Sequence, residues 1–455
     1  MSSRAVQQLI RGRSRLAGSV RSVLNRLDLR AIDGEIVGHL PRPEIAGEGP
    51  VAAVREILQR VRSGGDEALL ACTREFDGVS LDSLRVHPTE VAAALDRIDA
   101  GVREALGVAA SRIEAFHRTQ LHPSTVYEDG GSIRSFAVPM ESAGCYVPGG
   151  RAAYPSTVLM TAIPAKVAGV DRVVVCVPPA RDSGTVADIT LAACAVAGVD
   201  EVYAIGGAQA IGALAYGTES VAKVDVICGP GNKYVAIAKR EVADAVGIAS
   251  AFAGPSEIVV VADESAPPAF AAVDVVVQAE HGPDGLAWLV CWDESVADAV
   301  SAEVMRITEA SPRRSEIEST LAVAGYAVIC RDPAQALEVA NAIAPEHLQL
   351  MTAEPESLVG SVRNAGAIFC GPWSPASLGD YVAGPSHVLP TDGTARFSSA
   401  LTVADFQKHH HVITFTPEQA VALAPSVEAF ATAEGLDAHA LSARLRREAL
   451  EGGEI

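Results

Sequence analysis

The chain has 455 residues, of which 49% are hydrophobic, 20% charged and 5% aromatic, and its formal net charge is −20. So much apolar side chain excludes a disordered chain, and the length suggests about three domains. The acidic charge argues against sequence-independent nucleic-acid binding, which needs a surplus of Lys and Arg. The longest charge-free window, residues 202–218, is shorter than the roughly 20 residues of a membrane helix. We therefore expect a soluble enzyme that acts on small molecules, with no membrane or nucleic-acid partner.

The cysteines and the N-terminus indicate a cytoplasmic protein. The eight cysteines include no C-x-x-C pair, and several interrupt apolar runs such as Val173–Val177. This pattern predicts reduced, mostly buried thiols and neither disulfides nor a Cys-based zinc site. The first thirty residues carry seven arginines but only one acid, Asp28, without an apolar segment or a cleavage-like site. They are expected to be a short extension and not a targeting signal.

Hydrophobic periodicity predicts the secondary structure. Residues 54–120 repeat apolar positions every three or four residues, which predicts an N-terminal helical segment. From Asp171 onward, short β-branched runs alternate with Ala-rich stretches of helix length. The expected strands are residues 173–177, 202–205, 224–228, 258–262, 286–292, 327–330 and 367–370, and the expected helices are residues 186–196, 208–215, 234–246, 268–279, 296–307 and 334–343. This alternation predicts parallel sheets covered by helices, in two units that divide near Gly254-Pro255. After His387 we expect an irregular stretch over residues 390–413 and then two helices.

Three glycine turns lead toward predicted helices, at residues 144–150, 206–209 and 229–232. Ligands of open α/β sheets bind beyond the carboxyl ends of the strands, where helix N-termini favour phosphate. None of the turns has the G-x-G-x-x-G spacing, and each by itself is an ordinary tight turn. Three in succession favour a ligand that carries phosphate.

Polar clusters near the predicted helix ends suggest a metal site. Gln278 and His281 share a helix face, while Asp380, His387 and His439 lie later in the chain. Taken alone, His281 before a glycine is simply a favourable charge at a helix C-terminus. Together, amide, imidazole and carboxylate donors suit zinc.

Two further histidine clusters have different interpretations. Glu346 and His347 pair an acid with an imidazole, which suits proton transfer, although a surface histidine at a helix end fits the sequence equally well. The run His409–His411 cannot form a compact chelate, because adjacent strand residues point to opposite faces. It is expected to be a solvated or half-buried strand.

These clusters, in this order, resemble the histidinol dehydrogenases from about residue 23 to residue 447. The matching motifs are Tyr146–Gly150, Gly206–Ala210, Gly229–Asn232, Ala253–Glu257, Gln278–His281, Pro345–His347, Ser377–Tyr381, His387–Pro390 and Glu434–His439. The Arg-rich start before Val23 has no counterpart in the family, and Cys145 occupies a variable position. The resemblance implies a homodimeric enzyme with one Zn²⁺ per subunit, which oxidises L-histidinol through L-histidinaldehyde to L-histidine and consumes two NAD.

The resemblance also implies roles for individual residues. The implied zinc ligands are Gln278, His281, Asp380 and His439, and the implied NAD contacts are Tyr146, Gln209 and Asn232. The implied substrate-site residues are Ser256, Gln278, His281, Glu346, His347, Asp380, Tyr381, His387, Glu434 and His439. Glu434 and His439 would come from the neighbouring chain of the homodimer. Ser156 is a family position near the active site for which the sequence suggests no role.

The predicted organisation is an α/β fold of two incomplete Rossmann-like parallel-sheet domains, with small helical domains at both ends. Residues 1–48 would be an extension and helical segment. Residues 49–144 would join residues 258–388 in a first domain that carries the metal and catalytic loops. Residues 145–257 would form the NAD-binding domain, and residues 389–455 a tail domain exchanged between subunits.

In the implied mechanism, zinc orients the substrate, His347 handles protons, and Glu346 activates the water that adds to the aldehyde. A thiolate could replace that water, and Cys145 and Cys370 are the candidates. Because neither has a cation beside it in the sequence, we expect water. Two other functions use the same residues: a zinc hydrolase with Glu346 as base, and a non-catalytic dimer stabilised by the metal.

Overall fold

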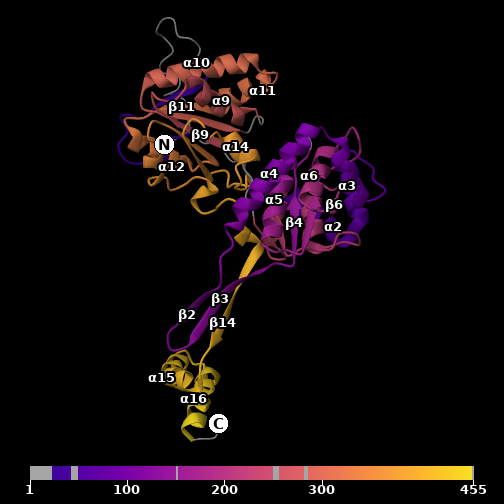
Figure 1. Ribbon diagram of the computed structural model, residues 1–455, viewed down its shortest axis with the longest axis vertical. Helices are drawn as coiled ribbons and strands as arrows, with labels where there is room; N and C mark the ends of the chain where they lie inside the picture. Colours follow the sequence, from indigo (N-terminus) through magenta and orange to yellow (C-terminus); the bar gives the residue numbers. More distant parts are fainter. Residues whose placement is uncertain (1–22, 42–49, 150–151, 250–255, 281–284, 453–455) are drawn as a thin grey trace.

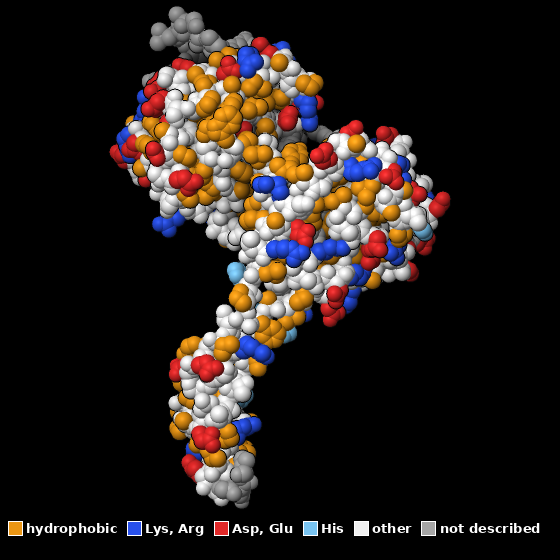
Figure 2. All heavy atoms as spheres, in the orientation of Figure 1, with side chains coloured by type: hydrophobic (Ala, Val, Ile, Leu, Met, Phe, Trp, Pro, Cys, Tyr) orange, Lys and Arg blue, Asp and Glu red, His pale blue; other side chains and the backbone are white. Residues whose placement is uncertain are grey.

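The computed structural model describes residues 23–41, 50–149, 152–249, 256–280 and 285–452. Two α/β lobes lie side by side, and a narrow arm runs from them to a pair of helices near the C-terminus (Figure 1). The same outline is seen in the space-filling view (Figure 2). Each lobe is built on a parallel sheet, and the predicted α/β fold class is confirmed. No helix in the described ranges is both long and apolar enough to cross a membrane.

The first lobe contains a parallel six-stranded sheet with the order β1-β11-β10-β9-β12-β13. Its strands are β1 (Asn25–Asp28), β9 (Glu257–Ala262), β10 (Leu286–Cys291), β11 (Gly325–Ile329), β12 (His347–Met351) and β13 (Ala367–Cys370). Its helices are α9 (Pro268–Ala279), α10 (Glu294–Ala310), α11 (Arg314–Ala324), α12 (Pro333–Ile343), α13 (Pro355–Val359) and α14 (Ala376–Tyr381). Along β9, Ile258 and Val260 pack in one apolar core, while Val259 and Val261 pack in another. Cores on both faces explain the continuous apolar run of this strand.

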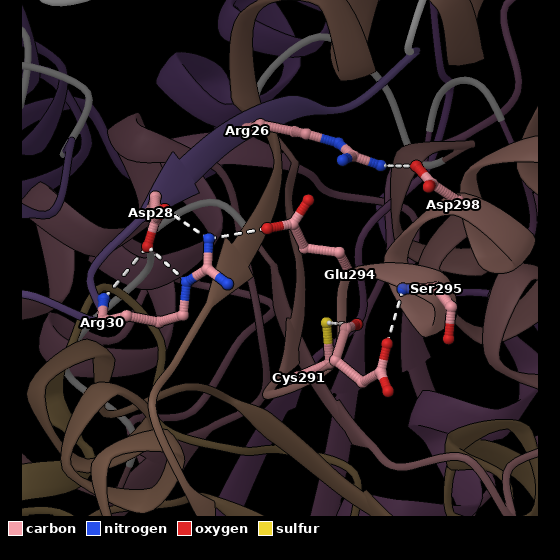
Figure 3. Close-up of polar contacts among 8 residues, drawn as sticks. Arg26, Asp28, Arg30, Cys291, Glu294, Ser295 and Asp298 are labelled. Atoms are coloured by element: carbon pink, nitrogen blue, oxygen red, sulfur yellow. Dashed lines mark hydrogen bonds and ion pairs between the residues drawn. The ribbon is translucent and has the colours of Figure 1, made fainter.

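The described part of the N-terminal segment is not the separate helical piece that we expected of residues 1–48, of which residues 1–22 and 42–48 lie outside the described residues. Residues 23–41 belong to the first lobe, where β1 pairs with β11 and a short 3₁₀ turn follows at Val37–His39. Arg30 forms ion pairs with Asp28 at 2.7 Å and with Glu294 at 2.6 Å, and Arg26 pairs with Asp298 (Figure 3). Such exposed pairs contribute little, so the strand is held mainly by its backbone pairing and by burial of neighbouring leucines.

The second lobe contains a parallel five-stranded sheet with the order β6-β5-β4-β7-β8. Its strands are β4 (Ser142–Tyr146), β5 (Arg172–Cys176), β6 (Glu201–Tyr203), β7 (Val226–Cys228) and β8 (Gly247–Ile248). Its helices are α2 (Val51–Cys72), α3 (Pro88–Arg97), α4 (Ala100–Arg118), α5 (Pro155–Val167), α6 (Asp188–Val196), α7 (Gly207–Tyr216) and α8 (Lys233–Glu241). Sequence periodicity did not predict β4. It includes Gly144, whose place a side chain could not take because a Cβ would lie 2.9 Å from Leu214.

The helices of residues 51–118 correct the predicted domain division. We expected residues 49–144 to join residues 258–388, but α2 packs on α7, α3 on α6, and α4 on α5. The physical reason is the apolar face of α2, where Val54 and Val61 share a core with Ile211. The N-terminal helices therefore complete the second lobe.

The arm is a long antiparallel sheet that ends in two helices (Figure 1). Its strands, β2 (Thr125–Glu128), β3 (Ser132–Pro139) and β14 (Gln407–Thr414), lie in the order β14-β3-β2. Beyond them, α15 (Pro417–Ala433) packs against α16 (Asp437–Gly452). The two C-terminal helices and the exposed strand at His409–His411 are confirmed. The expectation of an irregular stretch up to residue 413 is wrong from Gln407 onward, because β14 forms only by pairing with the distant β3.

The cysteines have the predicted character. All eight are free, and seven are buried, whereas Cys370 is half-buried. Cys145 and Cys228 lie opposite each other on β4 and β7, with their sulfur atoms 3.7 Å apart.

We predict that Gly229→Ala destabilises the second lobe. Gly229 has φ +102°, and a Cβ there would lie 2.0 Å from the carbonyl oxygen of Tyr146. Backbone strain of this kind costs about 1–3 kcal/mol, so thermal unfolding should shift several degrees lower. The control is Gly360→Ala, where φ is −62° and a Cβ would meet nothing within 4 Å. Equal melting temperatures for the two variants would contradict the prediction.

Candidate active site

A cavity of ≈ 330 Å³ contains side chains from both lobes. The second lobe contributes the loops after β4 and β7, at the carboxyl ends of their strands. The first lobe contributes Glu346 and His347, which precede or begin β12 and so lie at the amino ends of its strands. The residues that line the cavity include Pro148, Ser156, Thr157, Gly229, Lys239, Ser256, Glu346, His347, Asp380, Tyr381 and His387. The expectation that the ligand-binding loops follow their strands therefore accounts for one lobe only.

Glu346 and His347 are buried together at this edge. The Oε2 atom of Glu346 accepts a hydrogen bond from the backbone N–H of Glu257 at 3.2 Å. The same oxygen lies 3.7 Å from Nδ1 of His347. Nδ1 also faces the carbonyl oxygen of Glu257 at 3.4 Å, which fixes the plane of the imidazole ring. Phe369 stacks on this ring, with 6.0 Å between the ring centroids.

The other ring nitrogen of His347 faces Asp380. The distance from Nε2 to Oδ1 of Asp380 is 3.3 Å. Asp380 lies on α14, which is seated on β13 so closely that a Cβ at Gly379 would lie 2.6 Å from Phe369. The backbone of Asp380 positions a second histidine, because its carbonyl oxygen lies 2.8 Å from Nδ1 of His387.

Burial and charge have opposite effects on the ionisation of these groups. Burial lowers the pKa of His347, but the carboxylates of Glu346 and Asp380 outweigh burial and raise the pKa to about 9. Burial raises the pKa of Glu346, although His347 and the Glu257 N–H act in the other direction. Burial lowers the pKa of His387. Opposed effects of burial and charge on three groups within one cavity are typical of a functional site.

Only part of the predicted metal-ligand set comes together. Gln278 is buried near the end of α9, and Asp380 lines the cavity. Burial, and to a smaller extent the negative charges of Asp380 and of Glu280 after α9, raise the pKa of Tyr381 on α14. His281 lies outside the described residues. His439 is exposed on α16 and, with Glu434, belongs to the arm, away from the cavity of its own chain (Figure 1). Among the described residues, no three His, Cys, Asp or Glu side chains gather as metal ligands.

The residues predicted to contact NAD lie at the edge of the second lobe, each with a contact inside the protein. Tyr146 is buried, and its hydroxyl accepts a hydrogen bond from the N–H of Gly207 at 3.1 Å. Gln209 is buried in the first turn of α7. Asn232 caps α8 and accepts from the N–H groups of Tyr234 and Val235. None of the three is among the residues that line the cavity, although Pro148 and Gly229 are.

Thr157 and Lys239 are among the cavity residues that sequence reasoning missed. Thr157 lies on α5, and its hydroxyl is 3.2 Å from Nε2 of His387. Lys239 is buried on α8, and its Nζ donates to the carbonyl oxygen of Gly229. The only signal for Lys239 was a lysine that follows the apolar residues 235–238. Ser156, which had no predicted role, and Ser256 also line the cavity.

A family model and curated relatives of this chain carry the same description. A family model described as histidinol dehydrogenase matches residues 40–447. The histidinol dehydrogenase of Synechococcus sp. is 48% identical over 404 residues, which cover 88% of this chain and 93% of the relative. That of Bacillus subtilis is 46% identical over 395 residues, covering 86% of this chain and 92% of the relative.

A solved structure agrees with the sequence comparisons. The crystal structure of histidinol dehydrogenase from Elizabethkingia anophelis superposes with a TM-score of 0.91 at 33% identity, covering 95% of this chain and 100% of that one. The resemblance of the motifs is thus confirmed over nearly the whole chain. This chain belongs to the histidinol dehydrogenase family, the NAD-dependent oxidoreductases of histidine biosynthesis that convert L-histidinol to L-histidine.

Proposed function

We propose that this chain is a cytoplasmic enzyme that oxidises L-histidinol to L-histidine in the cavity between its lobes, with zinc bound and two NAD consumed. The observation that carries the proposal is the position of Glu346, His347 and Asp380. These proton-transferring groups share one cavity with the glycine loops after β4 and β7. Substrate chemistry and nucleotide binding would thus come from opposite lobes.

The second lobe has the features that a nucleotide needs. Its strand order reverses between β4 and β7, and ligands of open α/β sheets bind at such a switch point. Residues 229–231 line the cavity at this point. The N-cap of α7 is Gly206, which makes no side-chain cap; the N–H of Gly207 donates to the Tyr146 hydroxyl, and the other amide groups of the first turn would face an anion. A bound NAD would accept the hydride in each oxidation.

The donor chemistry around Asp380 fits zinc if two chains cooperate. We propose that Gln278, His281 and Asp380 of one chain and His439 of the other would hold the ion. Asp380 already lines the cavity, and Gln278 is buried near the end of α9. An amide oxygen, a carboxylate and two imidazoles are donors that zinc accepts. The bound ion would act as a template that fixes the substrate in position.

The side chains of this chain then handle protons. Because Nδ1 of His347 faces the carbonyl of Glu257, the deprotonated ring would present Nε2 to the cavity. Nε2 would accept the alcohol proton as a hydride leaves the carbinol carbon for NAD. The aldehyde must add water before a second hydride leaves, and the buried carboxylate of Glu346 would take a proton from that water. We propose that Ser256, Tyr381 and His387 complete the substrate site in this cavity.

The arm supports a dimeric arrangement. It projects away from the lobes and leaves apolar side chains of its helices in solvent (Figures 1 and 2). These are Leu423, Val427, Phe430, Leu436, Leu441 and Leu445, and Phe430 is 74% exposed. A helical pair with so much exposed apolar surface is stabilised by contact with another chain. We propose a homodimer in which each arm brings Glu434 and His439 to the partner's site.

The proposed function predicts two NADH for each L-histidinol consumed. NADH absorbance and amino-acid analysis of the same reaction would measure this ratio. One NADH per histidinol would mean that the reaction stops at the aldehyde. A hydrolase or a non-catalytic dimer would form no NADH, and that result would contradict the proposal.

We predict that Glu346→Gln slows oxidation of the aldehyde more than oxidation of the alcohol, because only the aldehyde requires an activated water. Loss of a general base lowers a rate by roughly 10²–10⁴-fold. Single-turnover NADH formation from L-histidinol and from L-histidinaldehyde would measure the two steps. Glu338→Gln is the matched control, since Glu338 is exposed on α12.

The same assay tests the thiolate alternative. Cys145 is fully buried against Cys228, and burial raises the pKa of Cys370. Neither cysteine is among the residues that line the cavity. Cys145→Ala and Cys370→Ala should therefore keep both oxidation steps. A folded cysteine variant that lost only the aldehyde step would contradict the role of water.

Mixed dimers test the shared metal site. His281→Ala and His439→Ala should each be inactive alone. In a mixed dimer, one site combines Gln278, His281 and Asp380 of the His439→Ala chain with the intact His439 of its partner. Refolding the variants together should recover about half of the wild-type turnover per mixed dimer, because one of the two sites is complete. Verified mixed dimers without activity would show that His439 does not serve the partner.

A further inference from the structure

An unusual carboxylate lies at the edge of the second lobe. Helix α2 continues into a π-helical turn, Thr73–Asp77, which ends at Asp77. The Oδ2 atom of Asp77 is inaccessible to solvent and has no hydrogen-bond partner among the described residues. Burial raises the pKa of Asp77 to about 6, although the positive charge of Arg181 acts in the other direction. Holding a carboxylate oxygen away from both water and donors is costly, and π-turns occur frequently at functional sites.

Specific contacts place Asp77 beside the proposed nucleotide-binding loops. Arg181, which follows β5, donates through Nε to the carbonyl of Asp77 at 3.1 Å and through its terminal nitrogen to the carbonyl of Phe76 at 3.2 Å. Burial, and to a smaller extent the negative charge of Asp77, raises the pKa of Tyr146 to about 12. Tyr146 in turn accepts the N–H of Gly207. Asp77 is therefore near the carboxyl end of β4 and the loop after β5.

This edge is continuous with the cavity. Pro178 packs against two of the glycine turns, because a Cβ at Gly149 or Gly206 would lie 2.5 or 2.6 Å from its ring. Gly149 directly follows Pro148, which lines the cavity. A dinucleotide with one end in the cavity could thus extend along these turns toward Asp77.

The chemistry of the edge indicates what Asp77 binds. In Rossmann-type sheets, an acidic residue about 20 residues after the glycine turn accepts hydrogen bonds from the ribose hydroxyls of NAD. Here β5 ends in Cys176 and continues as Val177-Pro178-Pro179; the acid of this loop, Asp182, is exposed, and its Oδ1 accepts a hydrogen bond from the N–H of Ser183 at 3.0 Å. Arg181, a cation that could otherwise receive the 2′-phosphate of NADP, is engaged by two backbone carbonyls.

We propose that Asp77 accepts hydrogen bonds from the ribose hydroxyls of the adenosine half of NAD and disfavours NADP, whose 2′-phosphate would meet its negative charge. This inference rests on the proposed use of NAD by the second lobe. Asp77 is a binding and specificity residue that the N-terminal helices, and not the sheet itself, supply. Phe76, exposed beside it, gives the same turn an aromatic surface.

Calorimetric binding of ADP-ribose, which is NAD without its nicotinamide ring, tests this role without turnover. Asp77→Asn should weaken binding about ten-fold, since a hydrogen bond to a charged group is lost. Glu75→Gln is the matched control. It removes one negative charge from the same turn, where Glu75 pairs instead with Arg60 at 3.0 Å, and it should bind like the wild type.

A second measurement requires no variant. ADP-ribose that lacks the adenosine 2′-hydroxyl should bind the wild type about ten-fold more weakly than ADP-ribose, whereas Asp77→Asn should bind the two ligands nearly equally. In steady-state assays, Asp77→Asn should raise the KM for NAD and lower the preference for NAD over NADP, with kcat little changed. Equal affinity of the wild type for ADP-ribose and for the analogue without the 2′-hydroxyl would overturn the inference. A folded Asp77→Asn variant with unchanged affinity for ADP-ribose would also overturn it. Failure of the wild type to bind ADP-ribose at all would instead overturn the proposed use of NAD.

Discussion

The contact of His347 with two carboxylates is the interaction on which the arrangement of the first lobe depends. A buried imidazole between Glu346 and Asp380 is favourable only if all three groups are held in register, because each pays a desolvation cost. The backbone of β9 provides this register through the N–H and carbonyl of Glu257. Helix α14 supplies Asp380 from the far side of β13. The apolar cores on both faces of the sheet therefore hold a polar cluster at its edge.

Opposite this cluster, the second lobe contributes mainly the backbone of its glycine turns and not charged side chains. Its turns can approach one another closely because glycine occupies the crowded positions, most clearly at Gly229 against the carbonyl of Tyr146. Lys239 stabilises the same turn, because its Nζ donates a hydrogen bond to the carbonyl oxygen of Gly229. One lobe thus contributes ionisable side chains and the other contributes amides and glycine turns. This division suits the proposed oxidation, in which substrate and nucleotide would meet between the lobes.

The arm and the N-terminal helices add residues that neither sheet contains. Strand β14 pairs with β3 over its whole length and carries the C-terminal helices away from the lobes. Their exposed apolar faces and the distance of His439 from its own cavity have a common explanation in a second chain. In the same way, α2 brings Asp77 to the glycine turns from outside the sheet. Elements remote in sequence complete both of the proposed binding sites.

The sequence by itself determined the local structure and the family. Alternating β-branched and Ala-rich runs predicted half of the strands in the described ranges, though not β12 with His347, and most of the helices. The motifs around Gln278, Glu346 and Asp380 identified the histidinol dehydrogenases. Local patterns suffice for this, since helical and strand periods and motif chemistry are properties of neighbouring residues. They could not show that Glu346 and His347 lie at the amino ends of the strands, nor reveal the unexpected strands β4 and β14.

Tertiary structure decided which lobe each element joins. The apolar pattern of the helices in residues 51–118 is compatible with either sheet. Packing of Val54 and Val61 in one core with Ile211 places them on the second lobe. The burial of Tyr146 and the unsatisfied oxygen of Asp77 likewise depend on partners far away in the chain. Long-range packing selects among placements that are locally equivalent, and its energy comes from the complementarity of apolar surfaces, which no short segment encodes.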